Sequence, residues 1–533
     1  FEYDKRGRIL SERLNTGSQK LYVYGNRSVT VDDNGRNYTR KFDAMGNLKS
    51  SEDPVSSVEY NYYSNGKPSC VKSGGYTISV EYDGAGNRTV LYDPDAGKNT
   101  YEYDCEGKLL KHIDGRGVTT RNSYDCFGQL CSTSGAMDET IYSRNRYGKV
   151  ISMQHDDSRI DYSYDKFGRI LTSMHTARDG YVMYKRFSYD RAGNVTSEKF
   201  SNGLVVNNVL DSYGNCVEKL IGDSTIWKFV KDDGLTYTGK MFSDKFKFTK
   251  QESEQGMLLL SALFQGDKEV CSAKYKFDPV KGNLLSRELP GAGYGEKFGF
   301  DELDRLISYN RVKRQISNIG IGGVGSFQNM DDSGMFAAGT IGSAIWGNFR
   351  PILMDFSYAY SSDGNITSSS ESGSYSYSEF HPHAVESIEN SNGAVSVMPQ
   401  DIIYNNIGKV DNISEEKENG EKYELCYYYG PDNQRSSTEL RKDGILKQTT
   451  YFGPGGEDID EDGILREFRY IGNGLLYYRD GNTDAKILYM FTDHQGSVTN
   501  IFDANGECLF SASYSPWGKM YVNRNKIGFI RGY

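Results

Sequence analysis

The sequence lacks the features that mark membrane-spanning, helical and nucleic-acid-binding proteins. It has no run of about 18 uninterrupted apolar residues, the length that a membrane-spanning helix needs. It also has no long segment with apolar residues at helical spacing, because Gly, Asp and Asn keep interrupting the pattern. The formal net charge is −10 and the isoelectric point is near 5.4, whereas a nucleic-acid partner requires a basic face. These absences favour an all-β protein with no membrane span and no nucleic-acid partner.

Aliphatic residues are also scarce, while tyrosine and glycine are abundant. Hydrophobic residues make up only 37% of the chain, yet it contains 42 Tyr, 25 Phe and 59 Gly against 3 Trp and 11 Pro. This composition cannot fill several compact aliphatic cores. We therefore expect one large sheet whose buried face is lined by amphipathic tyrosines.

The chain is built on an internal repeat of the form Y-D-x-x-G-x-[LIV]. From Gly107 through Gly128 and Gly148 to Gly168, the glycines step by 21, 20 and 20 residues. A fixed period of about 20 residues is typical of stacked-repeat architectures. The residues that carry the repeat most clearly are Tyr103, Asp104, Gly107, Tyr124, Asp125, Gly128, Tyr164, Asp165 and Gly168.

Each repeat predicts a strand, a turn and a returning strand. Tyrosine in an alternating sequence favours a strand, and an Asp at the start of a turn can accept hydrogen bonds from the backbone that follows it. Glycine supplies the positive φ that such a turn needs. Because this unit recurs, the predicted fold class is all-β, made of antiparallel hairpins.

The eight cysteines form no C-x-x-C pair. Cys105 and Cys126 hold the same place in neighbouring repeats, but equivalent positions two strands apart lie about 9.6 Å apart. This exceeds the roughly 7 Å that separates the Cα atoms of a disulfide. We expect eight free thiols.

We divide the chain into five segments by how well the repeat is kept. Residues 1–218 carry regular repeats, residues 219–309 carry degenerate ones in which Asp304 replaces a glycine, and residues 351–490 resume the repeat. Residues 310–350 form a glycine-rich apolar insertion, and residues 491–533 form a C-terminal stretch with its own motif. Since the chain starts inside a repeat at Phe1 with no initiator methionine or signal sequence, we expect it to be a piece of a longer protein.

The insertion contains Gly320, Gly322 and Gly325 in the pattern G-x-G-x-x-G. A nucleotide-binding loop of this kind needs a preceding strand and a following helix, and neither is readable here. Apolar residues beside flexible glycines favour an internal plug or a partner contact instead.

The acidic run between Glu457 and Gly463 contains D-x-D-x-D-G, the start of a calcium loop. Its candidate ligands are Asp458, Asp460 and Asp462. The twelfth loop position is Arg469, where calcium needs a bidentate Glu. We interpret the run as a polar hairpin turn and keep a calcium site as the alternative.

No other pattern predicts catalysis, a metal or a cofactor. G-x-S-x-G, H-E-x-x-H and P-loop motifs are absent, and the recurring aspartates are suited to turns rather than to acid–base chemistry. His381 and His383 could share a strand face, but no third metal ligand follows at suitable spacing, so we expect a surface loop. His494 follows Asp493 and could act as a base.

The C-terminal stretch carries a second motif, whose residues are Asp493, His494 and Gly496, then Asp503 and Gly506, then Tyr514, Trp517 and Gly518. Together with the repeats, it resembles the RHS/YD-repeat family, whose pattern runs D-H-L-G-S, D-x-x-G and Y-x-x-W-G. Gln495 stands where the family has Leu. The resemblance covers essentially the whole chain, least well from residue 219 to residue 350.

The resemblance implies a spiral antiparallel sheet that closes into a hollow shell, a β-cocoon. It implies a non-enzymatic shell of a bacterial polymorphic toxin, related to toxin-complex subunits and teneurins, that encloses a C-terminal toxin domain and helps deliver it in interbacterial competition. The implied partners are that toxin domain, its immunity or chaperone protein and a secretion-apparatus component, with the protein secreted or on the cell surface. His494 then has a structural role. The family's downstream cleavage motif and toxin are absent from this sequence.

The direction of the tyrosines separates this hypothesis from an alternative, a cell-surface carbohydrate-binding or adhesion protein with outward tyrosines. The repeat tyrosines occupy the same position relative to their glycines, and side chains at equivalent positions of such strands point to the same face of the sheet. We therefore expect the repeat tyrosines to line the inner face of the shell, with Ile113, Val150 and Leu171 filling the gaps between them. These tyrosines are Tyr82, Tyr103, Tyr124, Tyr164 and Tyr189.

Overall fold

A computed structural model describes residues 1–15, 17–135, 138–289, 294–313, 354–379, 381–390 and 400–531. Within these residues the chain forms strands and turns but no helix, so nothing in them is a helix that could cross a bilayer. The predicted all-β class is confirmed. Most of the insertion, with its G-x-G-x-x-G pattern, lies outside the described residues.

The first sheet contains 34 strands. They are β1 (Glu2–Tyr3), β2 (Ile9–Arg13), β3 (Gln19–Gly25), β4 (Ser28–Asp33), β5 (Arg36–Phe42), β6 (Leu48–Glu52), β7 (Ser57–Tyr62), β8 (Pro68–Ser73), β9 (Tyr76–Tyr82), β10 (Arg88–Asp93), β11 (Gly97–Tyr103), β12 (Leu109–Ile113), β13 (Thr119–Tyr124), β14 (Leu130–Ser134), β15 (Glu139–Arg144), β16 (Val150–His155), β17 (Ser158–Tyr164), β18 (Ile170–Thr176), β19 (Val182–Tyr189), β20 (Val195–Phe200), β21 (Val205–Leu210), β22 (Cys216–Ile221), β23 (Ser224–Asp232), β24 (Thr236–Met241), β25 (Phe246–Glu252), β26 (Leu258–Gln265), β27 (Lys268–Phe277), β28 (Leu284–Glu288), β29 (Tyr294–Phe300), β30 (Leu306–Lys313), β31 (Met354–Tyr360), β32 (Ile366–Ser369), β33 (Gly373–Tyr377) and β34 (Val385–Ile388).

The second sheet contains 12 strands. They are β35 (Gln400–Tyr404), β36 (Val410–Glu416), β37 (Lys422–Tyr429), β38 (Arg435–Lys442), β39 (Ile445–Gly453), β40 (Gly456–Glu461), β41 (Ile464–Gly472), β42 (Leu475–Asp480), β43 (Lys486–Thr492), β44 (Val498–Phe502), β45 (Cys508–Tyr514) and β46 (Met520–Asn525).

In both sheets the strands pair in sequence order, and all pairs are antiparallel, as at β11–β12, β12–β13 and β45–β46. This is the continuous hairpin meander that the repeat predicts. The expectation of one large sheet is wrong, because the described residues form two sheets that separate between β34 and β35.

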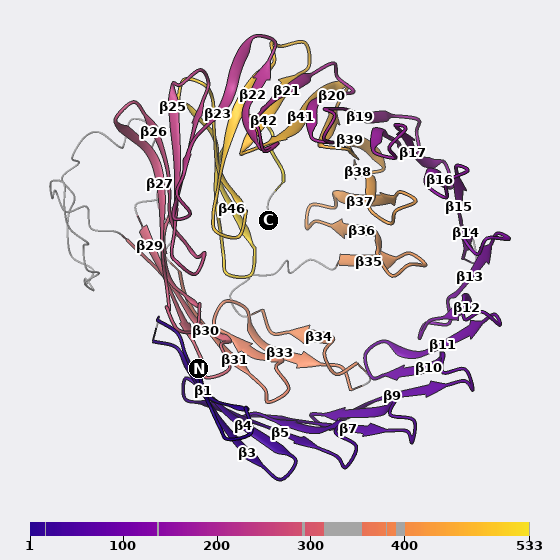
Figure 1. The fold of residues 1–533 in the computed structure, drawn as a ribbon. Coiled ribbons are helices and arrows are strands. Elements are labelled where there is room, and N and C mark those ends of the chain that lie inside the picture. The colour runs from indigo at the N-terminus through magenta and orange to yellow at the C-terminus, as the bar shows by residue number, and fades with distance from the viewer. Residues whose placement is uncertain are drawn as a thin grey trace.

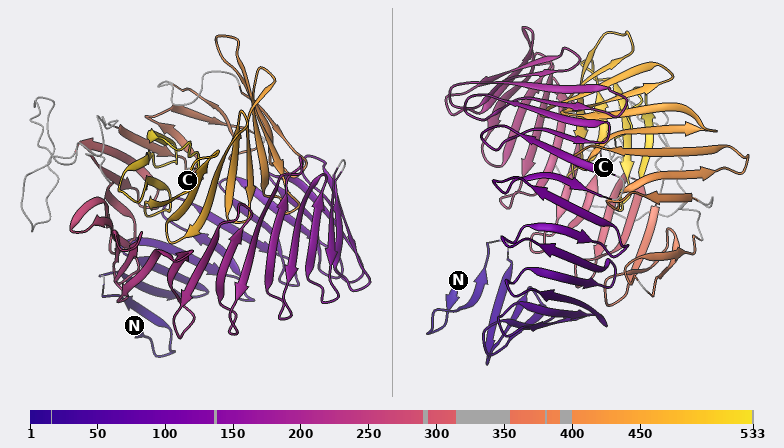
Figure 2. Two further views of the ribbon diagram at one scale, coloured as in Figure 1. Left: turned by 90° about the horizontal axis from the view of Figure 1, so that it is seen from above. Right: turned by 90° about the vertical axis from the view of Figure 1, so that its right-hand side faces the viewer.

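The meander winds as a spiral of two coils (Figure 1). Strands β1–β30, which we call the first coil, pass once around a ring, and β31–β46, the second coil, lie beside it along the ring axis (Figure 2). Where the first coil returns past its own start, Arg36 and Asp304 approach to 3.7 Å as an ion pair. Asn15 and Glu254 make a second contact there, a 3.4 Å hydrogen bond. The spiral shell that the family resemblance implied is confirmed.

The wall is one layer thick over the regular N-terminal repeats and two layers thick where β20–β28 meet β41–β45. Before Leu204, the only buried hydrophobic residues among those described are Val31, Ile160, Ala177, Met183 and Phe200. A large core then joins β20–β28 to β41–β45, and a second core lies within β40–β46 and the residues that follow. The single large sheet that the sequence predicts would leave its tyrosine face uncovered, but in this part of the wall a second sheet covers that face. There the second coil bends inward and packs face to face on the first.

Candidate functional site: the inner wall and the seam

The signature turn is fixed by its aspartate and its glycine. The carboxylate of Asp104 accepts hydrogen bonds from the backbone N–H of Glu106 (2.9 Å) and of Lys108 (2.8 Å). The N–H of Gly107 donates to the carbonyl of Asp104, and the φ of Gly107 is 84°. The same pattern recurs in the turns of Asp125 with Gly128 and of Asp165 with Gly168. The predicted turn role of these residues is confirmed, and Asp304, at φ 62°, takes the left-handed position where its repeat lacks the glycine.

The signature tyrosine ties each repeat to the one before it. The hydroxyl of Tyr124 donates to the carbonyl of Leu109 at 2.9 Å, and that of Tyr164 to the carbonyl of Val150 at 2.7 Å. Each acceptor follows the glycine of the preceding repeat by two residues, so the motif spacing sets this contact. Burial of the ring raises the pKa of Tyr164, which keeps its hydroxyl protonated as a donor.

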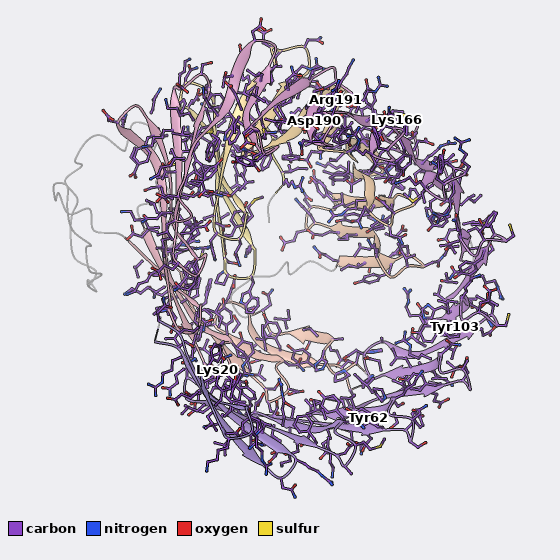
Figure 3. The ribbon with its side chains drawn as sticks, viewed as in Figure 1. Lys20, Tyr62, Tyr103, Lys166, Asp190 and Arg191 are labelled. Atoms are coloured by element: carbon purple, nitrogen blue, oxygen red, sulfur yellow. The ribbon has the colours of Figure 1, made fainter. Side chains whose placement is uncertain are left out.

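Basic residues link the signature turns along one edge of the sheet. Lys149 donates to the carbonyl of Gly168 at 2.8 Å, and its ammonium lies 5.2 Å from the ring centroid of Tyr164. Arg169 repeats the arrangement one turn later, donating to the carbonyl of Asp190 at 3.2 Å. Figure 3 labels Lys166, Asp190 and Arg191 in these neighbouring turns. Hydrogen bonds therefore join these neighbouring turns along the rim of the sheet.

The tyrosine face of the sheet is its inner face. Phe277 holds the signature position of β27, and its ring lies 6.1 Å from that of His494, whose neighbouring strands β43–β45 run inside the ring (Figure 1). The repeat tyrosines hold the same position in their strands and are half-buried, while residues at alternate positions are mostly exposed. Figure 3 marks two signature tyrosines, Tyr62 on β7 and Tyr103 on β11. The five tyrosines thus share the inner face, as predicted.

The prediction that Ile113 fills a gap between the inner-face tyrosines is wrong. Ile113 pairs with Thr100 and so lies on the outer face, whereas its neighbour His112 pairs with Tyr101. The rings of His112 and Tyr101 stack at 4.7 Å, and His112 Nε2 lies 2.9 Å from the side-chain oxygen of Asn99. The filler in this repeat is therefore an imidazole. Val150 contributes its carbonyl to Tyr164, as described above.

The two coils meet along a seam of turns. The second coil contributes signature turns, and the first coil contributes the turns at its opposite edge. Arg116, in the turn after β12, donates to the carbonyls of Asn405 (3.2 Å) and Asn406 (2.8 Å). Further along, the hydroxyl of Ser158 lies 3.3 Å from the carbonyl of Tyr429. The signature rim of the first coil takes no part in these seam contacts.

The His381–His383 segment also lies on this seam. His381 Nδ1 is 2.8 Å from the carbonyl oxygen of Asp95, and the backbone N–H of His383 donates to the Asp95 carboxylate at 2.9 Å. The two histidines are thus joined to another coil and do not simply occupy a surface loop. Among the residues with described positions, no group of three or more His, Cys, Asp or Glu side chains could hold a metal ion.

The acidic run forms a hairpin between β40 and β41. Its turn is Asp462-Gly463, both at positive φ, and Asp460 accepts the N–H of Gly463 at 2.9 Å. Asp458 lies in the strand, buried, with Arg469 donating to both of its carboxylate oxygens at 2.6 and 2.8 Å. The residue that takes the Glu position of a calcium loop is therefore the ion-pair partner of Asp458.

The C-terminal motif is anchored by a buried charge cluster. The carboxylate of Asp493 accepts the N–H of Gln495 and of Ser497, both at 2.9 Å, as an ordinary signature turn does. Its second oxygen lies 3.4 Å from the guanidinium of Arg287, which also donates to the carbonyl of Tyr514 at 3.2 Å. The turn is thereby attached to β28 of the first coil.

Glu296 and Arg311 complete this cluster. Arg311 pairs with Glu296 at 2.7 Å, and Arg287 forms a second ion pair with the same carboxylate. Burial opposes ionisation of Glu296, but the two guanidinium groups overcome it, so its pKa lies below the usual value. Two cations thus face two carboxylates, those of Glu296 and Asp493, so the buried cluster is balanced in charge. Such an arrangement is suited to fixing one geometry of the chain.

His494 packs inside this region. Its ring lies 5.1 Å from that of Tyr275, and burial, assisted by Arg287, lowers its pKa. The two rings are tilted at 47° to each other, and His494 Nδ1 has no hydrogen-bond partner among the described residues, so the structure does not pair this imidazole with the carboxylate of Asp493. Trp517 meets Tyr358 of β31 edge to face at 5.6 Å, and Gly518 has a φ of 85° in its turn. The C-terminal motif thus marks where the two coils join.

Sequence reasoning missed the cluster partners on β28–β30. Arg287, Glu296 and Arg311 carry no repeat motif, and the partners of the two arginines on the second coil lie about 200 residues away. One signal was available. Glu296 lies four residues before Phe300, the signature aromatic of its strand, and residues an even number of positions apart in a strand share a face. The sequence therefore places a charge on an inner face that is otherwise uncharged.

All eight cysteines are free thiols in the structure. Cys105 and Cys126 are exposed in neighbouring signature turns, whereas Cys271 and Cys508 are buried in the core between the coils. Burial raises the pKa of the Cys508 thiol, so it is not poised as a thiolate nucleophile.

The last described residues lie inside the ring (Figure 1). After β46 the chain turns back, and Phe529 is buried against Phe468 and Phe510. The guanidinium of Arg531 stacks over the ring of Tyr470 at 4.7 Å, and Tyr470 donates to Glu457 at 2.8 Å. The chain is therefore held on the inner side of the wall up to Arg531.

Comparison with known proteins gives similarity in fold and, more weakly, in sequence. No protein-family model matches the chain. It is 27% identical over 167 residues to Double-stranded DNA deaminase toxin A of Burkholderia cenocepacia, covering 31% of this chain and 10% of that protein. It is 21% identical over 435 residues to Teneurin-4 of Mus musculus, covering 72% of this chain and 15% of that protein.

Among solved structures, the chain is similar to TcdB2-TccC3 without hypervariable C-terminal region, with a TM-score of 0.78 and 14% identity. The alignment covers 98% of this chain and 30% of that chain. The fold is therefore shared over essentially all of this chain, which spans less than a third of each of these proteins.

Proposed function

We propose that this chain, which has the RHS/YD-repeat shell fold, is a non-enzymatic container for a polypeptide attached to its C-terminal end. The observation that carries the proposal is the position of residues 526–531, which return from β46 to the interior of the ring (Figure 1). A segment that continues from Arg531 starts inside the shell, because this stretch is fixed to the inner wall by Phe529 and by the Arg531–Tyr470 contact.

The similar proteins support a toxin as the enclosed segment. One is named a DNA deaminase toxin, and one is a structure described as lacking a hypervariable C-terminal region. We extend this to a secreted or surface-exposed bacterial protein that delivers its toxin to competing bacteria. An immunity or chaperone protein and a component of a secretion apparatus are then its further partners.

A structural role agrees with the chemistry of the described residues. The buried charged groups Arg287, Glu296, Arg311 and Asp493 are paired with one another and balanced in charge. The alternative of an outward sugar-binding surface loses its main support, because the signature tyrosines face inward and donate their hydroxyls to neighbouring strands.

The test is protease protection of a passenger. A folded domain of about 100 residues, within the capacity expected of a shell of this sheet area, is fused after Tyr533. In a matched control the same domain is fused before Phe1, which lies at the periphery of the ring (Figure 1). We expect the C-terminal passenger to survive a protease that removes the N-terminal one. Equal digestion of both passengers would contradict the proposal.

A further inference from the structure

A cavity of about 660 Å³ lies between the two coils, where their sheets pack face to face. One wall comes from β23–β25 of the first coil, and the other comes from the β41–β42 turn and β43 of the second coil. The exposed lining residues gather at the ends of β23, β25 and β41 or in the turns that follow, so the cavity opens at this edge. They are Asp232, Gly234, Leu235, Glu252 and Asn473. The volume is typical of sites for small organic molecules.

The inner part of the cavity is lined by aromatic rings from both coils. The ring centroids of Phe248 and Tyr489, one on each coil, lie 5.5 Å apart, and both side chains are buried. Gly239 pairs with Phe248 across the β24–β25 ladder. A Cβ at Gly239 would lie 3.0 Å from Nε1 of the buried Trp227, so this glycine leaves room for the indole beside the phenyl ring. Flat ring surfaces of this kind favour a planar aromatic ligand.

A lysine lies within this aromatic lining. Lys250 pairs directly with Tyr237 on β24, and residues two apart in a strand share a face, so its side chain lies on the same face as Phe248. The ammonium is 5.6 Å from the ring centroid of Phe248 and the side chain is half-buried. Among the residues that the structure describes, no carboxylate forms an ion pair with Lys250. A partly buried cation of this kind is stabilised when an anion pairs with it.

Two carboxylates also line the cavity, but they lie at its mouth. Asp232 and Glu252 are both exposed, and Asp232 accepts the backbone N–H of Gly234 at 2.9 Å. Water solvates charges in such positions, whereas Lys250 is withdrawn between the sheets. A ligand that enters between the sheets therefore meets a positive charge, which attracts an anionic group and repels a cationic one.

We propose that this cavity binds an aromatic organic anion, that is, a planar ring system that carries a carboxylate, sulfonate or phosphate group. The ligand packs against the rings of Trp227, Phe248 and Tyr489, and its anionic group pairs with Lys250. The site does not depend on the proposed container function, because no enclosed segment takes part in it. Since the two walls belong to different coils, a bound ligand contacts both coils and stabilises their packing.

The test compares two fluorescent probes with the same ring system. Anilinonaphthalene sulfonate carries one sulfonate, and phenylnaphthylamine is its neutral counterpart. Each is titrated into the full chain, and the melting temperature is measured with and without the probe. We expect one equivalent of the sulfonate to bind and to raise the melting temperature. Lys250→Met keeps an apolar side chain of similar length but removes the charge, so it should weaken sulfonate binding by about tenfold and change binding of the neutral probe by less than about twofold.

Lys247→Met is the matched control. Lys247 lies on the same strand, and its ammonium is 6.0 Å from the ring centroid of Phe264, but the residue is exposed and lies on the opposite face of β25. This variant should bind both probes as the native protein does. If Lys250→Met fails to fold, Leu235→Trp replaces it, since Leu235 is exposed at the mouth. The added bulk there should narrow the entrance and weaken binding of both probes.

The ring system is tested by displacement of the bound sulfonate with decanoate, an anion with a saturated chain, which should compete only weakly. Displacement by decanoate as effective as by unlabelled naphthalene sulfonate would overturn the assignment of an aromatic ligand. The proposal as a whole is overturned if the native protein binds no sulfonate probe. It is also overturned if Lys250→Met binds the sulfonate as tightly as the native protein, or if Lys247→Met weakens it equally.

Discussion

The rings of Tyr181 and Tyr451 stack across the seam with their centroids 4.0 Å apart, and each hydroxyl donates to a carboxylate of the opposite coil. Tyr181 donates to Asp458 at 3.0 Å, and Tyr451 donates to Asp179 at 2.5 Å. Because the exchange is reciprocal, a shift of either coil breaks both hydrogen bonds and the ring contact together. This pair therefore fixes the register of one coil on the other.

The stacked pair should be energetically coupled. Tyr451→Phe keeps the ring and removes one hydrogen bond, so it should lower the free energy of unfolding by about 1 kcal/mol. Tyr451→Ala also removes the ring contact, which is worth about 0.5–1.5 kcal/mol beyond the area it buries. Denaturant unfolding of single and double variants with Tyr181→Ala measures the coupling. Strictly additive effects would mean that the two rings act independently.

The ion pair of Asp458 and Arg469 should be costly to break from one side. Arg469→Met leaves a buried carboxylate without its cation and should cost about 3–5 kcal/mol. Adding Asp458→Asn should recover part of this loss, because the charge that lacks a partner is removed. The melting temperature should be highest for the native protein, lower for the double variant and lowest for Arg469→Met.

The same hairpin gives a direct test of calcium binding. With Asp458 occupied by Arg469, added Ca²⁺ should leave the melting temperature unchanged. A rise with Ca²⁺ that is absent from an Asp460→Asn, Asp462→Asn variant would establish the calcium site and refute the hairpin interpretation.

Two buried glutamates should give opposite pH dependences. Arg287 and Arg311 hold the pKa of Glu296 below its ordinary value of 4.5, despite burial. Its contribution to stability is therefore full above that value and is lost as the pH falls through the folded pKa. Glu296→Gln should destabilise the protein at neutral pH and flatten this acid loss in unfolding experiments that extend from neutral pH to well below pH 4.5.

Glu457 provides the opposite case. Burial raises its pKa, with only partial opposition from the hydrogen bond of Tyr470. Protonation therefore favours the folded state, and stability contributed by this group rises as the pH falls through its folded pKa towards 4.5. Glu457→Gln should leave the protein as stable or more stable at pH 7 and remove that rise. A marked loss of stability at pH 7 would show that the charge of Glu457 is needed.

The signature glycines should be conformationally required. Gly128 has a φ of 76°, where a β-branched residue is strained, so Gly128→Val should cost more than about 1 kcal/mol. Gly84 lies in an equivalent turn without positive φ, and nothing would contact an added Cβ there. Gly84→Val should therefore have a much smaller effect, and equal melting temperatures for the two variants would count against the turn assignment.

The sequence predicts what is local in this molecule. The spacing of Tyr164, Asp165 and Gly168 specifies strand, turn and inner face, because each bond of the turn closes within four residues. The interval between repeats likewise sets the tyrosine contact to the strand before. These features need no knowledge of how the coils are placed.

The seam could not be predicted in this way. The segment from Tyr92 to Gly97 resembles a signature turn with one extra residue, yet it joins β10 to β11 at the opposite edge, where Asp95 meets His381. Contacts such as Arg116 with Asn406 or Arg287 with Asp493 link residues that are about 200–300 positions apart. They depend on the circumference of a coil, which is set by the accumulated twist of some thirty strands and not by any one motif.

The most direct measurement of the central claim is the position of a passenger fused after Tyr533, seen by electron microscopy as a difference between the fused and unfused protein. The account predicts added density within the ring, adjoining β46 and Tyr470, with the outline of the shell unchanged. Added density outside the wall, with the interior as empty as in the unfused protein, would contradict it.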